Sequence, residues 1–194
     1  SCVVTMVAGA ITGSMAYIVM VYLNVFLKTY GGFSVEGALY ITAYANICLI
    51  VLLPLFGMLS DRIGYARQME YAAISTIALS VPLYMLLASG NLFYILFAST
   101  MFAVLVAAIY SPLYPYIVVL FPAEQRYSGV ACSLNIGIAL LGGTCAVISI
   151  QLINVTKIMW SPALYISGIC FLFLITNRLL RQRNKYAVEA QEII

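Results

Sequence analysis

Six long apolar stretches, separated by short polar connections, make up almost the whole chain. They cover residues 2–27, 38–59, 71–89, 92–120, 130–153 and 163–180. A helix of about 20 apolar residues, rising about 1.5 Å per residue, crosses a hydrocarbon core of about 30 Å. The stretches lack the alternation of a membrane β-barrel strand, and backbone groups in lipid must find hydrogen bonds within their own segment. The pattern therefore predicts an all-α membrane protein with six transmembrane helices.

The composition supports a membrane protein and argues against several other classes. Hydrophobic residues make up 64% of the 194 residues and charged residues only 8%, and the mean hydropathy is +1.07. The chain has no histidine, and Asp61 is its only aspartate, so an intramembrane protease with a Ser–His pair or two aspartates is excluded. The phosphate-binding loop of ATP-driven pumps is also missing. We therefore expect no enzyme activity and no cofactor.

Basic residues gather on one side of the predicted membrane protein. If the six helices alternate in direction, only Lys28 and Lys157 lie on one side. The other side holds Arg62, Arg67, Arg126, Arg178, Arg181, Arg183 and Lys185. The positive-inside rule then predicts that this second side, with both ends of the chain, faces the cytoplasm and that the protein lies in the cell membrane. Residues 1–180 form the six-helix unit and residues 181–194 a cytoplasmic tail near anionic lipid head groups. No nucleic acid partner is expected.

Small residues and prolines predict where helices approach one another or bend. Gly9 and Gly13 have GxxxG spacing in the first span, and Ala139 and Gly143 have the same spacing in the fifth, so we expect close crossings at both. Two prolines in the long fourth span predict a bend, because proline removes a backbone hydrogen bond: Pro112 and Pro115. The five cysteines lack metal-ligand spacing, so we expect apolar packing and no metal site: Cys2, Cys48, Cys132, Cys145 and Cys170.

The most informative polar segment joins the second and third apolar stretches. Residues 57–67 read Gly-Met-Leu-Ser-Asp-Arg-Ile-Gly-Tyr-Ala-Arg. Gly57 and Gly64 permit close backbone approach and unusual dihedrals, and Asp61 can pair with an arginine or with a helix N-terminus. Arg62 and Arg67 supply cations to neighbours or to lipid phosphates. The alternative is a plain charged turn that satisfies the positive-inside rule.

This hairpin resembles the signature loop of the major facilitator superfamily, which joins the second and third helices of a six-helix repeat. The matching residues are Gly57, Leu59, Asp61, Arg62, Gly64 and Arg67. Tyr65 and Ala66 take the place of two usual cations. The charge of the loop is weaker as a result, but its Asp-Arg-x-Gly core is intact.

A second segment narrows the resemblance. Residues 121–130 read Phe-Pro-Ala-Glu-Gln-Arg-Tyr-Ser-Gly-Val and lie between the fourth and fifth spans. They are similar to a segment of the metabolite:proton symporter branch, which includes proline/betaine, 2-oxoglutarate, citrate and shikimate carriers. Members of that branch commonly have an acidic residue just before the Phe-Pro pair, where this chain has Val118, Val119 and Leu120.

The resemblance implies a fold, a partner and a latch. It implies that the chain forms helices seven to twelve of a twelve-helix carrier, with an N-terminal six-helix half as its missing partner, and that the two halves rock about a site between them. The implied cargo is a small organic solute carried with protons. We expect Asp61 to stabilise the outward-open state by pairing with Arg126 or with the dipole at the start of the fifth span.

Polar side chains at mid-membrane depth are the candidates for a solute cavity, because exposing them to lipid costs free energy. They are Tyr17, Asn24, Tyr40, Tyr44, Asn46, Tyr110, Tyr114 and Asn135. Interfacial anchoring or hydrogen bonding between helices is the alternative for each. An aromatic-rich cavity would suit a betaine-like quaternary ammonium through cation–π contacts.

No predicted span has an Asp, Glu, Lys, Arg or His at its centre, and Glu70 lies near the edge of the third. A proton-coupled carrier needs a titratable group in its pathway, so we expect the proton-binding carboxylate in the N-terminal half. Two functions remain open. The chain is half of a secondary carrier for proline, betaine or an organic acid, or it is a non-transporting fragment of a split or decayed carrier gene.

Overall fold

The computed structural model describes residues 2–191, and every regular element in that part of the chain is helical. Six of its stretches are long and apolar enough to cross a membrane, which confirms the predicted all-α fold with six spans. The first three spans are α1 (Cys2–Tyr17) with η1 (Ile18–Tyr22) and α2 (Leu23–Thr29), then α3 (Val35–Ile63), then α4 (Tyr65–Leu87). The last three are α5 (Leu92–Tyr110) with α6 (Leu113–Val118), then η2 (Ala123–Gln125) with α7 (Arg126–Gly137), η3 (Ile138–Gly142) and α8 (Cys145–Thr156), then α9 (Ser161–Gln191).

The charged connection between the second and third spans is shorter than the sequence predicts. Gly64 alone joins the end of α3 at Ile63 to the start of α4 at Tyr65. Its φ of 92° is in a region that glycine adopts without strain, and its N–H donates to the Ser60 carbonyl at 2.9 Å. The third span therefore begins before residue 71, because charged side chains on the last and first turns of two helices do not interrupt the backbone hydrogen bonds.

The sixth span also extends further than its apolar part. The apolar stretch covers Ser161–Leu179, but the helix α9 continues to Gln191. The segment predicted as a tail is thus helical as far as Gln191, and residues 192–194 lie outside the described part of the chain. Hydropathy marks where a helix enters a polar environment and does not mark where the helix ends.

The fourth span bends where the prolines predict. α5 ends at Tyr110 and α6 begins at Leu113, with Pro112 between them, and Pro115 lies within α6. Because Pro112 has no N–H, the carbonyl four residues earlier, that of Ala108, has no backbone donor in the helix. The predicted bend is confirmed, and it leaves a carbonyl that another group must satisfy.

Glycines join the first span to the fifth. A Cβ on Gly9 would lie 2.6 Å from the Leu134 carbonyl oxygen, and one on Gly13 would lie 3.2 Å from the Cα of Gly142. A Cβ on Gly137 would overlap the Met6 carbonyl oxygen. The close crossing predicted at Gly9 and Gly13 is confirmed.

The prediction for the other half of this crossing was wrong. In the fifth span the contact is made by Gly137 and Gly142, whereas a Cβ on Gly143 would meet only Ala139 of its own helix. Ala139 follows Gly137 by two residues, so it points to the other side of the helix and is exposed. The π-helical turn η3, with its wider i→i+5 hydrogen bonds, brings Gly142 onto the same face as Gly137. A GxxxG spacing assumes an uninterrupted α-helix.

The spans pack in a pattern that relates the first three to the last three. The first span packs against the fifth and sixth, the second against the fourth, and the third against the fourth and sixth. Exchanging the first span with the fourth, the second with the fifth and the third with the sixth reproduces these contacts. An inverted repeat of two three-helix units produces this symmetry.

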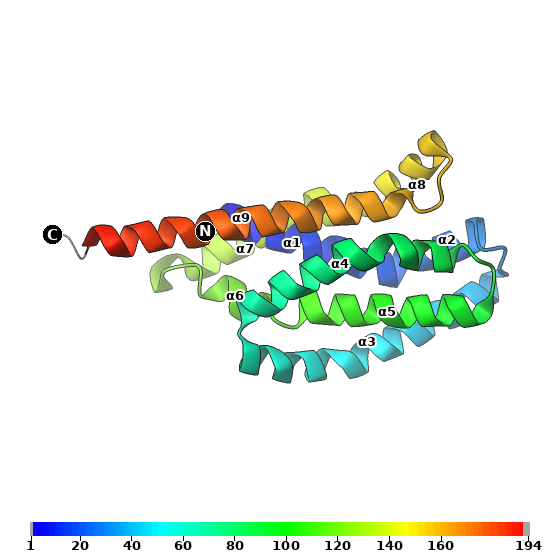
Figure 1. Ribbon diagram of the computed structural model, residues 1–194, viewed down its shortest axis with the longest axis horizontal. Coiled ribbons are helices and arrows are strands. Elements are labelled where there is room, and N and C mark those ends of the chain that lie inside the picture. The colour runs from blue at the N-terminus through cyan, green and yellow to red at the C-terminus, as the bar shows by residue number, and fades with distance from the viewer. Residues whose placement is uncertain (1, 192–194) are drawn as a thin grey trace.

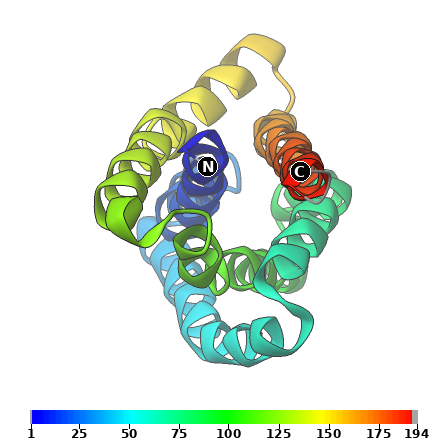
Figure 2. The ribbon, with the colours of Figure 1, turned by 90° about the vertical axis from the view of Figure 1, so that its left-hand side faces the viewer.

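The two arginine-bearing connections lie at the same end of the bundle. Figure 1 shows the α3–α4 and α6–α7 connections at the end where α1 begins and α9 ends, and Figure 2 looks onto this end, which we call the hairpin end. In Figure 2, α1 and α7 lie on one side of the bundle and α4 and α9 on the other, with α5 linking them. The arrangement places both sequence motifs on one face of the membrane protein.

Candidate functional site

The signature hairpin presents its charges at the hairpin end. Asp61, in the last turn of α3, accepts a hydrogen bond from the Tyr65 hydroxyl at 3.1 Å. Arg62 and Arg67 are exposed, and Gly64 provides the positive φ of the connection. Gly57 is different, because a Cβ there would meet no atom within 4 Å. Gly64 therefore needs to be glycine for its backbone conformation, as the motif predicts. No close approach of another group requires glycine at Gly57 in this structure.

The second motif is held together by its aromatic residue and a glycine. The ring of Phe121 lies against Gly129, where a Cβ would be 2.6 Å from a ring carbon. Arg126, the first residue of α7, donates from Nη2 to the Phe121 carbonyl at 3.5 Å, and its buried Nε has no partner in the described part of the chain. The Phe-Pro…Arg…Gly spacing therefore closes a compact turn before the fifth span.

The predicted latch is not formed in this structure. Among the described residues Asp61 bonds to Tyr65 and Arg126 bonds to Phe121, and the two side chains do not bond to each other. Arg126 is itself the first residue of α7, the helix whose N-terminus was the other predicted partner of Asp61. Pairing of Asp61 with Arg126 stays a prediction for another state of the protein.

The predicted cavity tyrosines lie mostly on the outside of this six-helix unit. Tyr40 is 76% exposed and Tyr114 53% exposed, and Tyr17, Tyr44 and Tyr110 are partly or largely exposed. The structure joins one of them to another span, since the Tyr44 hydroxyl lies 3.0 Å from Thr100 Oγ1 across α3 and α5. Tyr110 ends α5 and Tyr114 lies in the first turn of α6, one on each side of the bend in the fourth span. These side chains are available to line a surface that another part of the protein covers.

The predicted asparagines behave differently from one another. Asn135 is exposed and donates to the Ala131 carbonyl of its own helix at 2.7 Å. Asn24 is half-buried, and its Nδ2 is buried without a partner among the described residues. Asn46 is half-buried in α3. Asn24 is thus the amide most in need of a partner.

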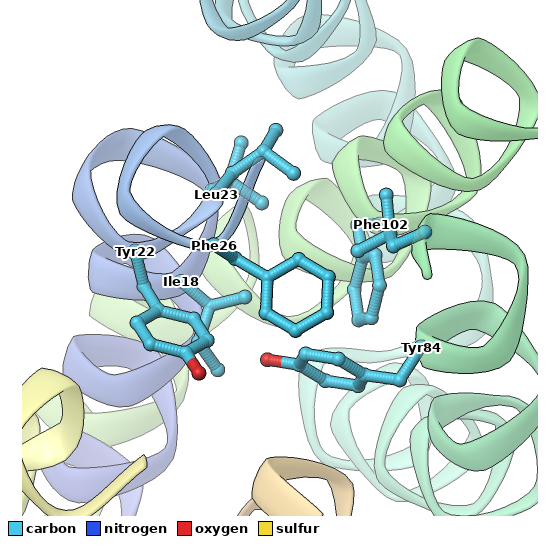
Figure 3. Close-up of a pocket in the computed structure, with 8 residues that line it drawn as sticks. Ile18, Tyr22, Leu23, Phe26, Tyr84 and Phe102 are labelled. Atoms are coloured by element: carbon cyan, nitrogen blue, oxygen red, sulfur yellow. The ribbon is translucent and has the colours of Figure 1, made fainter. Parts of the chain in front are cut away.

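Sequence reasoning missed a closed aromatic cluster inside the bundle. Tyr22, Phe26, Tyr84 and Phe102 pack with ring centroids 5.4 to 6.0 Å apart and are almost fully buried. Figure 3 shows Tyr22 and Tyr84 directing their hydroxyls toward a common region from η1 and α4. The cavity beside these rings has about 10 Å³ open to the centre of a water molecule, which is space for about one water. An organic solute does not fit here, so the cluster is core. The four-residue spacing of Tyr22 and Phe26 was the signal available in the sequence.

A π-turn also supplies a polar contact that sequence reasoning missed. The Leu141 carbonyl, in η3, accepts hydrogen bonds from Tyr165 at 2.7 Å and from Ser14 at 3.2 Å. Cys145 Sγ lies 3.8 Å from the Ser14 carbonyl. Interrupted helices release carbonyls from their own backbone bonds, and here one carbonyl joins the first, fifth and sixth spans.

Two further polar side chains make hydrogen bonds to the fourth span near its break, at the hairpin end. Asn177, which is buried in α9, accepts from the Tyr116 hydroxyl at 2.8 Å and donates to Glu70 Oε1 at 2.7 Å. Gln68, which is 3% exposed, places Nε2 and its two hydrogens within 3.0 to 3.1 Å of three acceptors, one on α3 and two at the end of α5. None of these residues was predicted from the sequence to line a cavity or to form a latch, because an isolated polar residue near a helix end has no distinctive pattern.

The chemistry open to these groups is non-covalent recognition. The described residues contain no cluster of three His, Cys, Asp or Glu side chains suited to a metal ion. Hydroxyls, amides and aromatic rings can bind a polar organic solute through hydrogen bonds and contacts with the ring faces. These groups come from several spans, so movement of one span relative to another changes which of them meet.

Comparison with known proteins gives the relationship. Residues 5–192 match the family described as the Major Facilitator Superfamily. The chain is similar to the ectoine/proline transporter ProP of Corynebacterium glutamicum, with 32% identity over 174 residues, which cover 85% of this chain and 34% of that protein. No solved structure matches the chain significantly.

Two other relatives extend the range of solutes. The proline/betaine transporter of Salmonella typhimurium is 26% identical over 200 residues, covering 99% of this chain and 39% of that protein. The citrate-proton symporter of Klebsiella pneumoniae is 26% identical over 181 residues, covering 93% of this chain and 41% of that protein. The chain thus spans 34% to 41% of the length of these three relatives, and all three are named as transporters or symporters.

Proposed function

The chain belongs to the major facilitator superfamily, and we propose that it forms the C-terminal six-helix half of a secondary carrier for a small organic solute. Membership rests on the match over residues 5–192, and the chain is a multi-pass membrane protein with six apolar spans. Relatives in the metabolite:proton symporter branch carry proline, betaine, ectoine or citrate according to their names. In this proposal the six spans are helices seven to twelve, and they move against an N-terminal half about a site between the two.

The solute we favour is a zwitterion of the proline or betaine kind. The observation that carries this choice is the chemistry of the candidates, all of which are neutral tyrosine hydroxyls or asparagine amides. A citrate-like polyanion needs cations to replace its hydration, and the central parts of these spans have none. A quaternary or secondary ammonium next to a carboxylate is neutral overall and suits aromatic faces through cation–π contacts.

The proton would bind in the other half of the carrier. Glu70, the acidic residue nearest to the middle of any of these spans, lies in the second turn of α4 and is bonded to Asn177 at the hairpin end. A coupling group has to reach the solute pathway and change its proton affinity between states. We therefore place the coupling carboxylate in the N-terminal half. The hairpin end of this chain's six spans would face the cytoplasm at the cell membrane.

An uptake experiment tests the proposal. The reading frame is extended upstream of Ser1, the whole protein is produced in cells that lack osmolyte uptake, and vesicles are supplied with labelled betaine, proline, ectoine, 2-oxoglutarate or citrate. We expect accumulation of a zwitterion that an uncoupler abolishes. Accumulation of citrate or 2-oxoglutarate alone would overturn the choice of solute but keep the carrier.

The second candidate function is a membrane fragment that transports nothing. In the proposed carrier the solute site lies between two six-helix halves, so six spans without a partner half would hold only part of that site. A stop codon directly upstream, with no labelled solute accumulating when the chain is produced with or without a separate N-terminal half, would support the fragment. Six further in-frame spans would support the carrier.

A further inference from the structure

We propose that Gln68 is a positioning residue through which the signature hairpin sets the angle of α6, the hairpin-end segment of the fourth span. The proposal rests on the proposed transport function only for its consequence, because the contact itself is a property of this six-helix unit. Its starting point is the carbonyl of Ala108, which loses its backbone donor to Pro112.

Gln68 supplies the missing donor. Its Nε2 lies 3.1 Å from the Ala108 carbonyl oxygen and 3.0 Å from Ser111 Oγ. The same Nε2 lies 3.1 Å from the Phe56 carbonyl oxygen in α3. Two of its three neighbours are carbonyls, which only accept, so the amide nitrogen and not its oxygen must face them. One side chain therefore spans the second, third and fourth spans at the point where the fourth is broken.

The hairpin determines where Gln68 lies. Its own N–H makes the first hydrogen bond of α4, to the Gly64 carbonyl at 3.0 Å. Gly64 has a positive φ of 92°, and Arg67 directly precedes Gln68. A change in the dihedrals of Gly64 therefore moves the amide that holds the break in the fourth span.

A second contact from α4 reaches the same short segment. Two residues after Gln68, Glu70 is bonded to Asn177, which in turn is bonded to Tyr116 of α6. The first two turns of α4 thus hold the fourth span on both sides of the break, at the end of α5 through Gln68 and in the middle of α6 through Asn177. Between these two points lies Tyr114, a predicted cavity residue that is 53% exposed.

The other side of the amide is free to accept a hydrogen bond after a rearrangement. Gln68 Oε1 is buried and has no hydrogen-bond donor in the described part of the chain. A buried amide oxygen without a partner costs free energy, so a shift of the hairpin that offered it a donor would compensate for lost contacts to Ala108. In the carrier, this would couple the signature hairpin to the tilt of α6 and thus to Tyr114.

Hydrogen exchange of the whole chain in lipid nanodiscs tests the contact without any solute. Gln68→Met keeps the length of the side chain and removes its donors, and we expect exchange of residues 113–118 to rise about tenfold, because leaving a buried carbonyl without a donor costs about the 1.4 kcal/mol that corresponds to a factor of ten. Gln151→Met, the same change at an exposed position of α8, is the matched control and should leave exchange of residues 113–118 unchanged. Equal exchange in the Gln68→Met and unaltered chains would overturn the proposal.

A second substitution makes the test specific to the broken helix. Pro112→Ala restores a backbone N–H for the Ala108 carbonyl, so in this background Gln68→Met should have a much smaller effect on residues 113–118. Additive effects would show that Gln68 does not act through this carbonyl and would overturn the proposal. If Gln68→Met alone fails to fold, recovery of folding in the double variant supports the proposal, and failure of both contradicts it.

The consequence for transport has its own readout. In a transporting whole protein, Gln68→Met should lower the maximal uptake rate and leave KM unchanged, because the residue does not touch the solute. Loss of protection in α6 without any measurable transport by the unaltered protein would remove the proposed function and keep the contact. Unchanged protection with lost transport would remove the contact and keep the function.

Discussion

Two regions of this bundle hold helices together by different means. Between the first and fifth spans, Gly9, Gly13, Gly137 and Gly142 bring backbones into direct contact. Between the third, fourth and sixth spans, at the hairpin end, Gln68 and Asn177 reach across with hydrogen bonds. Lipid tails are as apolar as the side chains of a span, so helices in a membrane adhere through close packing or polar contacts. Backbone packing dominates between the first and fifth spans, where Ser14 adds one hydrogen bond to the Leu141 carbonyl, and side-chain hydrogen bonds dominate at the hairpin end.

The two kinds of contact respond differently to movement. Backbone packing depends on steep short-range repulsion, so an added atom or a small shift is felt at once. A side-chain amide can exchange one acceptor for another over a few ångströms. We therefore expect the glycine region to move as a unit and the hydrogen-bonded region to rearrange.

The strongest destabilisation is expected from filling the glycine contact. Gly137→Ala places a methyl group against the Met6 carbonyl and should lower the free energy of unfolding by about 1–3 kcal/mol, as overpacking does. Gly168→Ala in α9 is the matched control, because a Cβ there meets no atom within 4 Å and alanine favours a helix. Thermal unfolding in nanodiscs measures both. Similar losses in the two variants would contradict the role of the crossing.

The hydrogen-bonded region should follow. Asn177→Leu removes an acceptor from Tyr116 and a donor from Glu70, and we expect a loss of about 1–3 kcal/mol, the cost of disturbing buried polar partners. Asn154→Leu, at an exposed position in α8, should change stability little. Unfolding in the same nanodiscs compares them, and a larger effect at Asn154 would contradict the assignment.

A weaker effect on stability is expected for Asp61 and Arg126, whose side chains are predicted to pair only in another state of the carrier. Asp61→Asn and Arg126→Ala should change stability additively, within about 0.5 kcal/mol, because the two side chains do not pair in this structure. Inside and outside accessibility of the whole carrier should instead show coupling if the pair forms in the outward-open state. Additivity in both measurements would remove direct pairing of Asp61 with Arg126.

The weakest effect concerns hydroxyls in the core. Tyr165→Phe deletes the bond to the Leu141 carbonyl and should cost about 1 kcal/mol. Tyr22→Phe removes a buried hydroxyl that has no protein partner among the described residues, so stability should stay the same or rise. Thermal unfolding of the two variants in the same nanodiscs compares their stabilities. A greater loss of stability for Tyr22→Phe than for Tyr165→Phe would show that the Tyr22 hydroxyl has a stabilising partner.

Sequence reasoning worked best where one property is repeated over many residues. The six spans, the bend at Pro112 and the glycine face of the first span were predicted, since each depends on local hydropathy, a missing N–H or missing side chains. It was less successful at boundaries such as Tyr65, because a helix continues through charged residues at its end. It failed at Ala139 and Gly143, because GxxxG spacing marks two positions on one face without showing whether that face meets another span, and the π-turn η3 placed Gly142 on the contact face instead.

The candidate site was predicted only in part. Tyr44 and Tyr114 were recognised as polar residues within apolar spans, and the structure places them on the exposed surface of the unit. Gln68 and Asn177 were missed, because their importance lies in acceptors on other spans. A released carbonyl can be inferred from Pro112, but the residue that satisfies it cannot.

The order of residues was enough to establish that this protein crosses a membrane six times and that two charged motifs belong to a known carrier family, since hydropathy and motif spacing are properties of neighbouring residues. The packed bundle was needed to learn which glycines meet, which amide completes the broken fourth span, and which tyrosines are closed inside the core. These depend on how each helix is rotated about its axis. A single π-turn changes that rotation without a recognisable mark in the sequence.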